Sequence, residues 1–172
     1  MCVRFCARRK KIEWVIVSTG MFMSFLFEPV FGVVDIKGNC VHALGSWENA
    51  VTVTTSENIG ALTSEILFAE PPIANQVVHV AGDTVTYRQL ADALDTLLNR
   101  KLHRKEWSVP ALKQALAEDP NDPIRKYRVV FAEGCGVAWD KKRTFNAQRG
   151  LGVRGLEDWM EQNLSVDQRA DI

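Results

Sequence analysis

The stretch from Lys11 to Phe27, KIEWVIVSTGMFMSFLF, decides the fold of this chain. Its first part, Trp14–Ser18, is a run of apolar and β-branched residues, which predicts a buried strand. Residues 18–20 predict a turn, and the apolar residues up to about Phe27 predict a short helix. Only Met1 to Lys10 precede this unit, which is too short to hold the neighbouring strands. We therefore expect the chain to start in the middle of a fold, with the N-terminal βαβ units missing.

Beyond this unit, strand signals alternate with helix signals. The predicted strands are Val41–Leu44, Ala50–Thr54, Gln76–Ala81 and Lys101–Trp107. The predicted helices begin at Ser56, at Thr86 (with Gln89 completing a capping box) and at Ser108, and cover Arg125–Glu133 and Gly155–Leu164. This alternation indicates the α/β class. The polar tail Ser165–Ile172 is expected to fray.

The charge balance argues against a nucleic-acid partner, because the formal net charge is zero. A local excess of basic residues precedes Glu13, and a basic start before an apolar run could indicate a signal peptide or a membrane anchor. However, residues 18–20 interrupt the apolar run, and Glu28 lies inside any window long enough to span a bilayer. The pattern favours a buried strand–helix unit and no membrane partner, with secretion or anchoring as the alternative.

The cysteines and histidines show no metal-binding pattern. Cys2, Cys6, Cys40 and Cys135 include no CxxC pair, and no histidine lies at ligand spacing. We interpret the thiols as reduced, which predicts a cytoplasmic protein. The histidines are His42, His79 and His103, and we interpret each as a structural or surface residue.

A literal GxGxxG motif occurs at residues 150–155, GLGVRG. In a dinucleotide-binding fold this motif follows a hydrophobic strand, so that its glycines can turn tightly against a pyrophosphate. Here the preceding residues are Asp140 to Arg149, DKKRTFNAQR, which are too polar for a buried parallel strand. The motif is therefore interpreted as a flexible turn before the last helix.

Five segments together resemble the C-terminal half of the NmrA-like family, in its fungal isoflavone-reductase-like branch. They are residues 12–29, 51–68, 77–94, 104–150 and 156–164, so the resemblance extends from about Val3 to Leu164. It implies a truncated NmrA-like domain over residues 1–164 and a flexible tail over residues 165–172. Members of this family pair a dinucleotide-binding sheet that carries a GxxGxxG loop with a smaller substrate-binding region. They typically transfer hydride from NADPH to a small aromatic substrate.

The resemblance also implies site residues. Ser18, Thr19 and Gly20 match the segment that borders the cofactor, here NADP, and open α/β sheets place ligands at such strand ends. Met21, Phe22 and Met23 would shape the substrate pocket, with Phe22 offering an apolar face. The alternative is that Phe22 and Met23 belong only to the core.

Two functional parts of the family have no match in the chain. The GxxGxxG loop is absent, and the family's catalytic lysine would fall one position before Met1, since the hydrophobic–Arg pair that follows it matches Val3-Arg4. The first hypothesis is therefore a truncated NADP-dependent reductase, inactive in this form but active at full length. The second is a non-catalytic, dinucleotide-sensing regulator or interaction protein, and the third is a product without function. A small-molecule substrate is expected, and the oligomeric state stays open.

Overall fold

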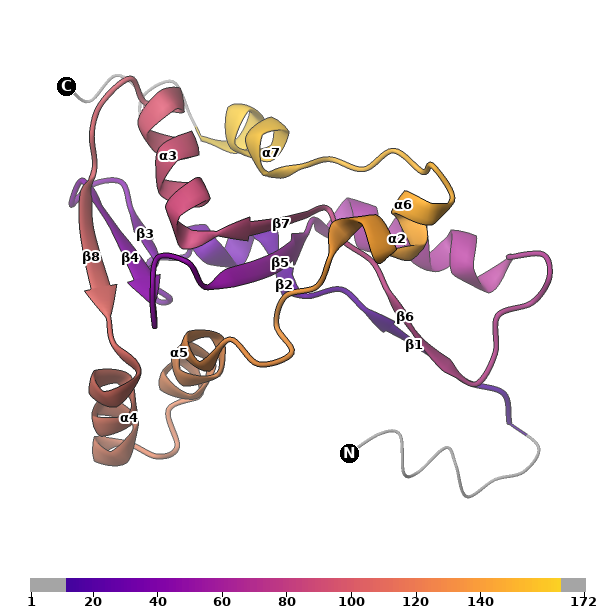
Figure 1. The fold of residues 1–172 in the computed structure, drawn as a ribbon, viewed down its shortest axis with the longest axis horizontal. Coiled ribbons are helices and arrows are strands. Elements are labelled where there is room, and N and C mark those ends of the chain that lie inside the picture. Colours follow the sequence, from indigo (N-terminus) through magenta and orange to yellow (C-terminus); the bar gives the residue numbers. More distant parts are fainter. Residues whose placement is uncertain (1–11, 165–172) are drawn as a thin grey trace.

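The structure is a computed structural model that describes residues 12–164 (Figure 1). The strands are β1 (Val15–Ser18), β2 (Met21–Phe22), β3 (Val34–Asp35), β4 (Cys40–Leu44), β5 (Ala50–Thr54), β6 (Gln76–His79), β7 (Asp83–Thr86) and β8 (His103–Trp107). The α-helices are α2 (Ser56–Leu67), α3 (Tyr87–Leu97), α4 (Val109–Glu118), α5 (Pro123–Glu133), α6 (Phe145–Gln148) and α7 (Leu156–Asn163). Two 3₁₀ helices, η1 (Met23–Phe27) and η2 (Lys141–Arg143), complete the list. The predicted α/β class is confirmed.

The strands form three small sheets. β1 and β6 pair in parallel, which places the strand of the opening stretch beside the strand that ends at His79. The second sheet has the order β2-β5-β7 and the third the order β3-β4-β8, each with one parallel and one antiparallel pair. Figure 1 shows the β1–β6 pair extending away from the other strands, towards the N-terminus.

The predicted helix directly after residue 20 is wrong. The backbone first forms β2, whose Met21 and Phe22 pair with Val53 and Thr54 of β5. Met21 is buried and Phe22 is exposed, which is the side-chain alternation of a strand. Only Met23–Phe27 then coils, as a 3₁₀ helix. Periodicity cannot separate a short buried strand from a short helix, so the apolar run by itself predicts the wrong element here.

Strand β7 is absent from the predicted elements, and several boundaries differ, among them the start of β8, which is His103 and not Lys101. The sequence at 82–83, Gly-Asp, reads as a turn, and β7 has a single buried apolar side chain, that of Val85. Antiparallel pairing with β5 extends this segment nonetheless. The preceding strand ends at His79, two residues before the predicted end. Helix α2 is capped by Thr55, whose side chain accepts from the Asn58 N–H, and not by Ser56.

Most of the other predicted helix starts are confirmed by their capping geometry. Thr86 and Gln89 form the reciprocal capping box at the start of α3. Ser108 caps α4, with Pro110 in the first turn. Helix α5 begins at Pro123, two residues before the predicted Arg125, and is capped by Asp122. These local patterns were readable in the sequence because each uses neighbouring residues only. The predicted tail at residues 165–172 lies outside the described residues.

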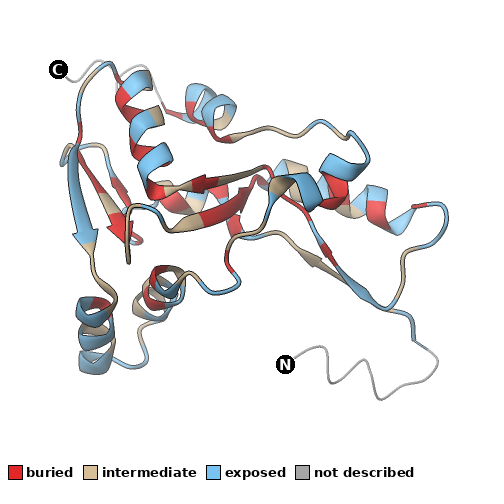
Figure 2. Ribbon diagram, viewed as in Figure 1, coloured by how far each residue is buried: buried red, intermediate tan, exposed pale blue. Residues whose placement is uncertain are grey.

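The core has two parts. The larger cluster joins the second and third sheets with α3 and α7, and it includes Met21, Met23, Phe31 and Tyr87. The smaller cluster packs Leu62 and Ile66 of α2 against Val78 and Val80. Figure 2 shows buried residues along β4 and β5 and on one face of α3, whereas α4 exposes most of its surface. Among residues 12–164, no helix is long and apolar enough to cross a membrane.

A buried carboxylate ties α3 to the start of β8. The side chain of Asp95 is 5% exposed and accepts hydrogen bonds from the Leu102 N–H (2.8 Å), Arg104 (2.8 Å) and Lys101 (3.0 Å). Burial by itself would raise the pKa of this carboxyl, but these hydrogen bonds lower its pKa below the ordinary value. The ionised form of Asp95 therefore stabilises the fold.

This shift predicts a loss of stability in acid. Because the folded-state pKa of Asp95 lies below its unfolded-state value of about 3.9, its contribution is fully present above that value. The contribution disappears as the pH falls through the folded-state pKa. We expect urea unfolding of Asp95→Asn to depend less on pH than that of the wild type as the pH falls below about 4. Identical pH slopes for the two proteins would contradict this assignment.

Candidate functional site

The carboxyl ends of β1 and β6 lie side by side. The parallel register pairs Ser18 with His79, and the Val80 N–H donates to the Ser18 carbonyl at 2.9 Å. His79 is exposed, and Ser18 is partly buried. In open α/β sheets, ligands bind where parallel strands end. This edge is therefore the natural place for a ligand among the described residues.

The turn after β1 depends on glycine. Gly20 has φ of +69°, and a Cβ atom at this position would overlap the carbonyl oxygen of Thr52. The Thr54 hydroxyl donates to the Thr19 carbonyl at 2.7 Å and fixes the preceding peptide. The predicted cofactor-binding residues Ser18, Thr19 and Gly20 thus form a turn at the strand end, whose backbone lies against β5.

The three predicted pocket residues separate into two groups. Met21 is 4% exposed and Met23 is fully buried, and both belong to the larger core cluster. Phe22 is 58% exposed and directs its ring away from that cluster. Of the three, only Phe22 is exposed enough to touch a ligand directly. The two methionines pack in the core next to the turn. The roles of these residues in binding remain predictions.

A polar network lies next to this turn. The Thr52 hydroxyl is 2.9 Å from that of Thr84 and accepts from the backbone N–H of Trp139, while the Thr84 hydroxyl donates to the Trp139 carbonyl. The Trp139 ring packs edge-on against His79, with centroids 4.9 Å apart. Its indole Nε1–H is buried and has no hydrogen-bond partner among the described residues. The network therefore links β5, β7 and the 134–140 loop to the end of β6.

Neither His79 nor Trp139 is predicted as a site residue from the sequence. Neither lies in a motif, and their proximity depends on the parallel pairing of β1 with β6 and on the path of a loop. One signal was available for His79. It stands near the end of a predicted strand, just as Ser18 does, and parallel strands bring such positions to one edge.

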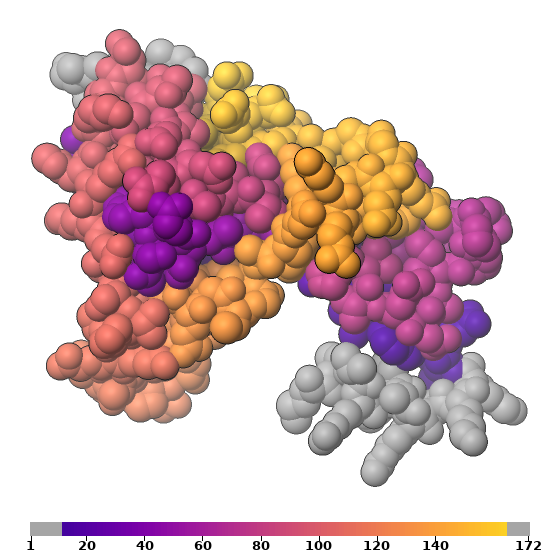
Figure 3. All heavy atoms as spheres, in the orientation of Figure 1, coloured from indigo at the N-terminus to yellow at the C-terminus, as the bar shows by residue number. Residues whose placement is uncertain are grey.

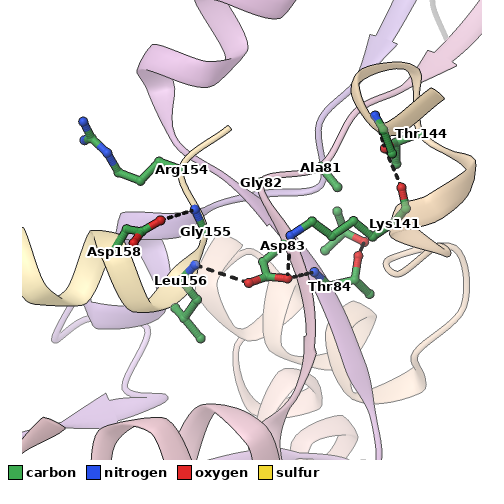
Figure 4. Close-up of polar contacts among 12 residues, drawn as sticks. Ala81, Gly82, Asp83, Thr84, Lys141, Thr144, Arg154, Gly155, Leu156 and Asp158 are labelled. Carbon is green, nitrogen blue, oxygen red and sulfur yellow. Dashed lines mark hydrogen bonds and ion pairs between the residues drawn. The ribbon is translucent and has the colours of Figure 1, made fainter. Parts of the chain in front are cut away.

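The GxGxxG segment at residues 150–155 does not form a phosphate loop. Helix α6, not a strand, precedes it, and Gly155 precedes the first turn of α7. Figure 4 shows the Asp83 carboxylate facing this turn, where it accepts from the Leu156 N–H at 3.3 Å and pairs with Lys141 at 3.2 Å. An anion at this helix start would meet a carboxylate, so the interpretation as a turn before the last helix agrees with the structure.

The described residues show no alternative centre based on a metal or a disulfide. Within residues 12–164, no group of three or more histidine, cysteine, aspartate or glutamate side chains could hold a metal ion. Cys40 and Cys135 are free, Cys40 buried and Cys135 exposed. The other two cysteines lie outside the described residues.

A comparison with curated proteins finds a relative of the chain. It is 43% identical over 154 residues to an NmrA-like family domain-containing oxidoreductase of Gibberella moniliformis (strain M3125 / FGSC 7600). The chain is a homologue of this NmrA-like oxidoreductase. The match covers 89% of the chain and 50% of the relative, so the chain spans about half the length of that protein. No protein-family model matches the chain.

Solved structures share the fold of this NmrA-like homologue. It superposes on an isoflavone reductase with a TM-score of 0.73 at 12% identity, covering 94% of the chain and 56% of the reductase. It superposes equally well, with a TM-score of 0.73 at 16% identity, on the leucoanthocyanidin reductase of Vitis vinifera in its binary complex with NADPH. That match covers 94% of the chain and 57% of the reductase. These likenesses show a Rossmann-like α/β fold.

The described residues can be compared with what the two ends of a dinucleotide need. The turn at residues 18–20, the exposed Phe22 and His79 offer backbone groups and aromatic faces at the edge of parallel strands. A pyrophosphate needs a glycine loop between a strand and a helix. The only GxGxxG segment within residues 12–164 has neither that context nor a free helix start. The described residues therefore hold no loop that suits the phosphates.

Proposed function

We propose that this chain supplies the substrate side of an NADP-dependent reductase of small aromatic compounds. NADPH would supply the hydride, and residues of this chain would bind the nicotinamide end and the substrate. The parallel pairing of β1 with β6 carries the proposal, because it brings Ser18, His79 and the turn before Phe22 to one ligand-binding edge. The relationship to an NmrA-like oxidoreductase and the fold shared with NADPH-binding reductases support it.

Each residue of the edge has a role in the proposal. The turn at Ser18, Thr19 and Gly20 lies against the nicotinamide, with Gly20 permitting a close approach of the backbone. Phe22 stacks on the aromatic ring of the substrate. His79, held against Trp139, is within the same edge and offers a ring nitrogen to a polar group of the substrate. Met21 and Met23 hold the turn from the core side. The scattered cysteines support a cytoplasmic location.

The proposal leaves the phosphate loop and the acid–base lysine to residues beyond this chain. A longer gene product with a strand–GxxGxxG–helix unit and a lysine just before Met1 is expected to oxidise NADPH in the presence of small aromatic carbonyl compounds. The 172-residue chain alone is expected not to do so. A longer product that binds NADPH without any turnover would overturn the reductase and favour a dinucleotide-sensing regulator.

Substitution of Phe22 tests the proposed stacking. In the longer product, Phe22→Ala is expected to lower kcat/KM for an aromatic substrate about tenfold, because an aromatic contact and its buried area are worth about 1.4 kcal/mol. Steady-state NADPH oxidation measures this loss. Val30→Ala is the matched control, since Val30 and Phe22 are each 58% exposed and Val30 lies outside the strand-end edge. Equal losses for the two variants would contradict a role for Phe22 in binding.

A further inference from the structure

A hollow lies along the outer edge of β6. Its volume is about 320 Å³, and its walls come from β6 on one side and from η2 and α6 on the other. Figure 3 shows the orange atoms of η2 and α6 lying against the magenta part of the molecule that contains β6. Within residues 12–164, β1 is the only strand that pairs with β6, so the other edge of β6 is open to the groove. A groove of this volume is at the lower end of the range for small-molecule sites.

The polar lining of this groove is cationic or neutral. Arg143 and Arg149 reach it from η2 and from the end of α6, and the remaining polar side chains are His79, Gln76 and Gln148. No carboxylate lines it. Within the described residues, neither guanidinium has an ion-pair partner, whereas Arg88, Arg104 and Arg125 each pair with an aspartate or a glutamate. The groove therefore presents two uncompensated positive charges.

The groove also has an apolar wall. Phe145 lies at its base, 8% exposed, and the Arg149 guanidinium packs over the Phe145 ring at 4.8 Å from its centroid. This contact holds one guanidinium in place before any ligand arrives. Val77, which is 43% exposed, adds apolar surface on the β6 side. A ligand that fills the groove would thus meet charge at one end and hydrocarbon along its length.

We propose that this groove binds a small aromatic oxyanion, whose charged group lies between Arg143 and Arg149 and whose ring packs against Phe145 and Val77. Guanidinium groups suit phosphate and carboxylate oxygens because they present paired N–H donors in a fixed fork. The glutamine amides and the backbone groups on the open edge of β6 supply further donors. The groove shares His79 with the edge described under the proposed function, but its two guanidinium groups and its apolar wall take no part in that function.

Phenyl phosphate is a suitable probe. Its binding to the 172-residue chain is expected to saturate in calorimetric or NMR titration, and to shift the ring resonances of His79 in the wild type. Inorganic phosphate is expected to bind at least tenfold more weakly, because it cannot contact the apolar wall. Equal affinities for the two probes, or no shift at His79, would overturn the proposed site.

Charge-removing variants locate the anion. Arg143→Gln and Arg149→Gln are each expected to weaken phenyl phosphate binding about tenfold, which is the usual effect of losing one charge-assisted hydrogen bond. Lys142→Gln is the matched control, because Lys142 is an exposed cation of η2 that does not line the groove. The control should keep the wild-type affinity, and far-UV circular dichroism should show the same fold for all variants. Similar weakening by all three would indicate diffuse attraction and overturn the site.

Discussion

Replacing Asp95 by alanine is expected to lower the free energy of unfolding by about 3 kcal/mol. The variant leaves the buried Leu102 N–H without its acceptor and Arg104 without one of its two carboxylate partners. An unsatisfied buried donor by itself costs about 1–3 kcal/mol. The Lys101 contact adds little, because the lysine side chain is 85% exposed. Equilibrium unfolding in urea measures the change.

Asp92 provides the matched control for this prediction. Its side chain is 57% exposed and pairs with the same Arg104 at 2.6 Å. Asp92→Ala is expected to cost about 1 kcal/mol or less, as exposed ion pairs usually do. Equal effects for the two alanine variants would mean that charge alone matters, and that burial of Asp95 and its bond to the Leu102 N–H do not.

Replacing Gly20 by alanine is expected to destabilise the fold by about 3 kcal/mol or more. A left-handed backbone conformation costs an alanine about 1–2 kcal/mol, and overlap with the Thr52 carbonyl forces β2 away from β5, which adds about 1–3 kcal/mol. The same displacement would move Phe22, so ligand binding at the strand-end edge should weaken too. Thermal or urea unfolding gives the first effect, and substrate titration of the longer product gives the second.

Gly150 separates strain from overlap. It has φ of +64°, close to that of Gly20, but a Cβ atom there would meet nothing within 4 Å. Gly150→Ala should therefore cost only the conformational part, about 1–2 kcal/mol. If both variants lower the free energy of unfolding by the same amount, the close packing of the residue 18–20 turn against β5 does not contribute to stability.

The sequence alone predicted much of the secondary structure. Thr86, with Gln89, and Ser108 predict the starts of two helices, because capping involves residues only a few positions apart. The β-branched alternation of Ala50–Thr54 announced β5. In contrast, the weakly apolar β7 and the short β2 depend on pairing with β5, which is distant in sequence and invisible to a local pattern. The relationship to an NmrA-like oxidoreductase was also predicted, from the sequences and the order of five segments, and it is confirmed.

The sequence by itself determined the α/β class, the family relationship and the turn that follows β1, because each is written in short-range patterns and in the order of segments. The tertiary structure decided which of these residues meet. Parallel pairing brought His79 opposite Ser18, the 134–140 loop carried Trp139 onto His79, and the Asp83 carboxylate closed the helix start behind the GxGxxG segment. These contacts join residues far apart in the chain, and their geometry follows from sheet register and packing rather than from any local preference.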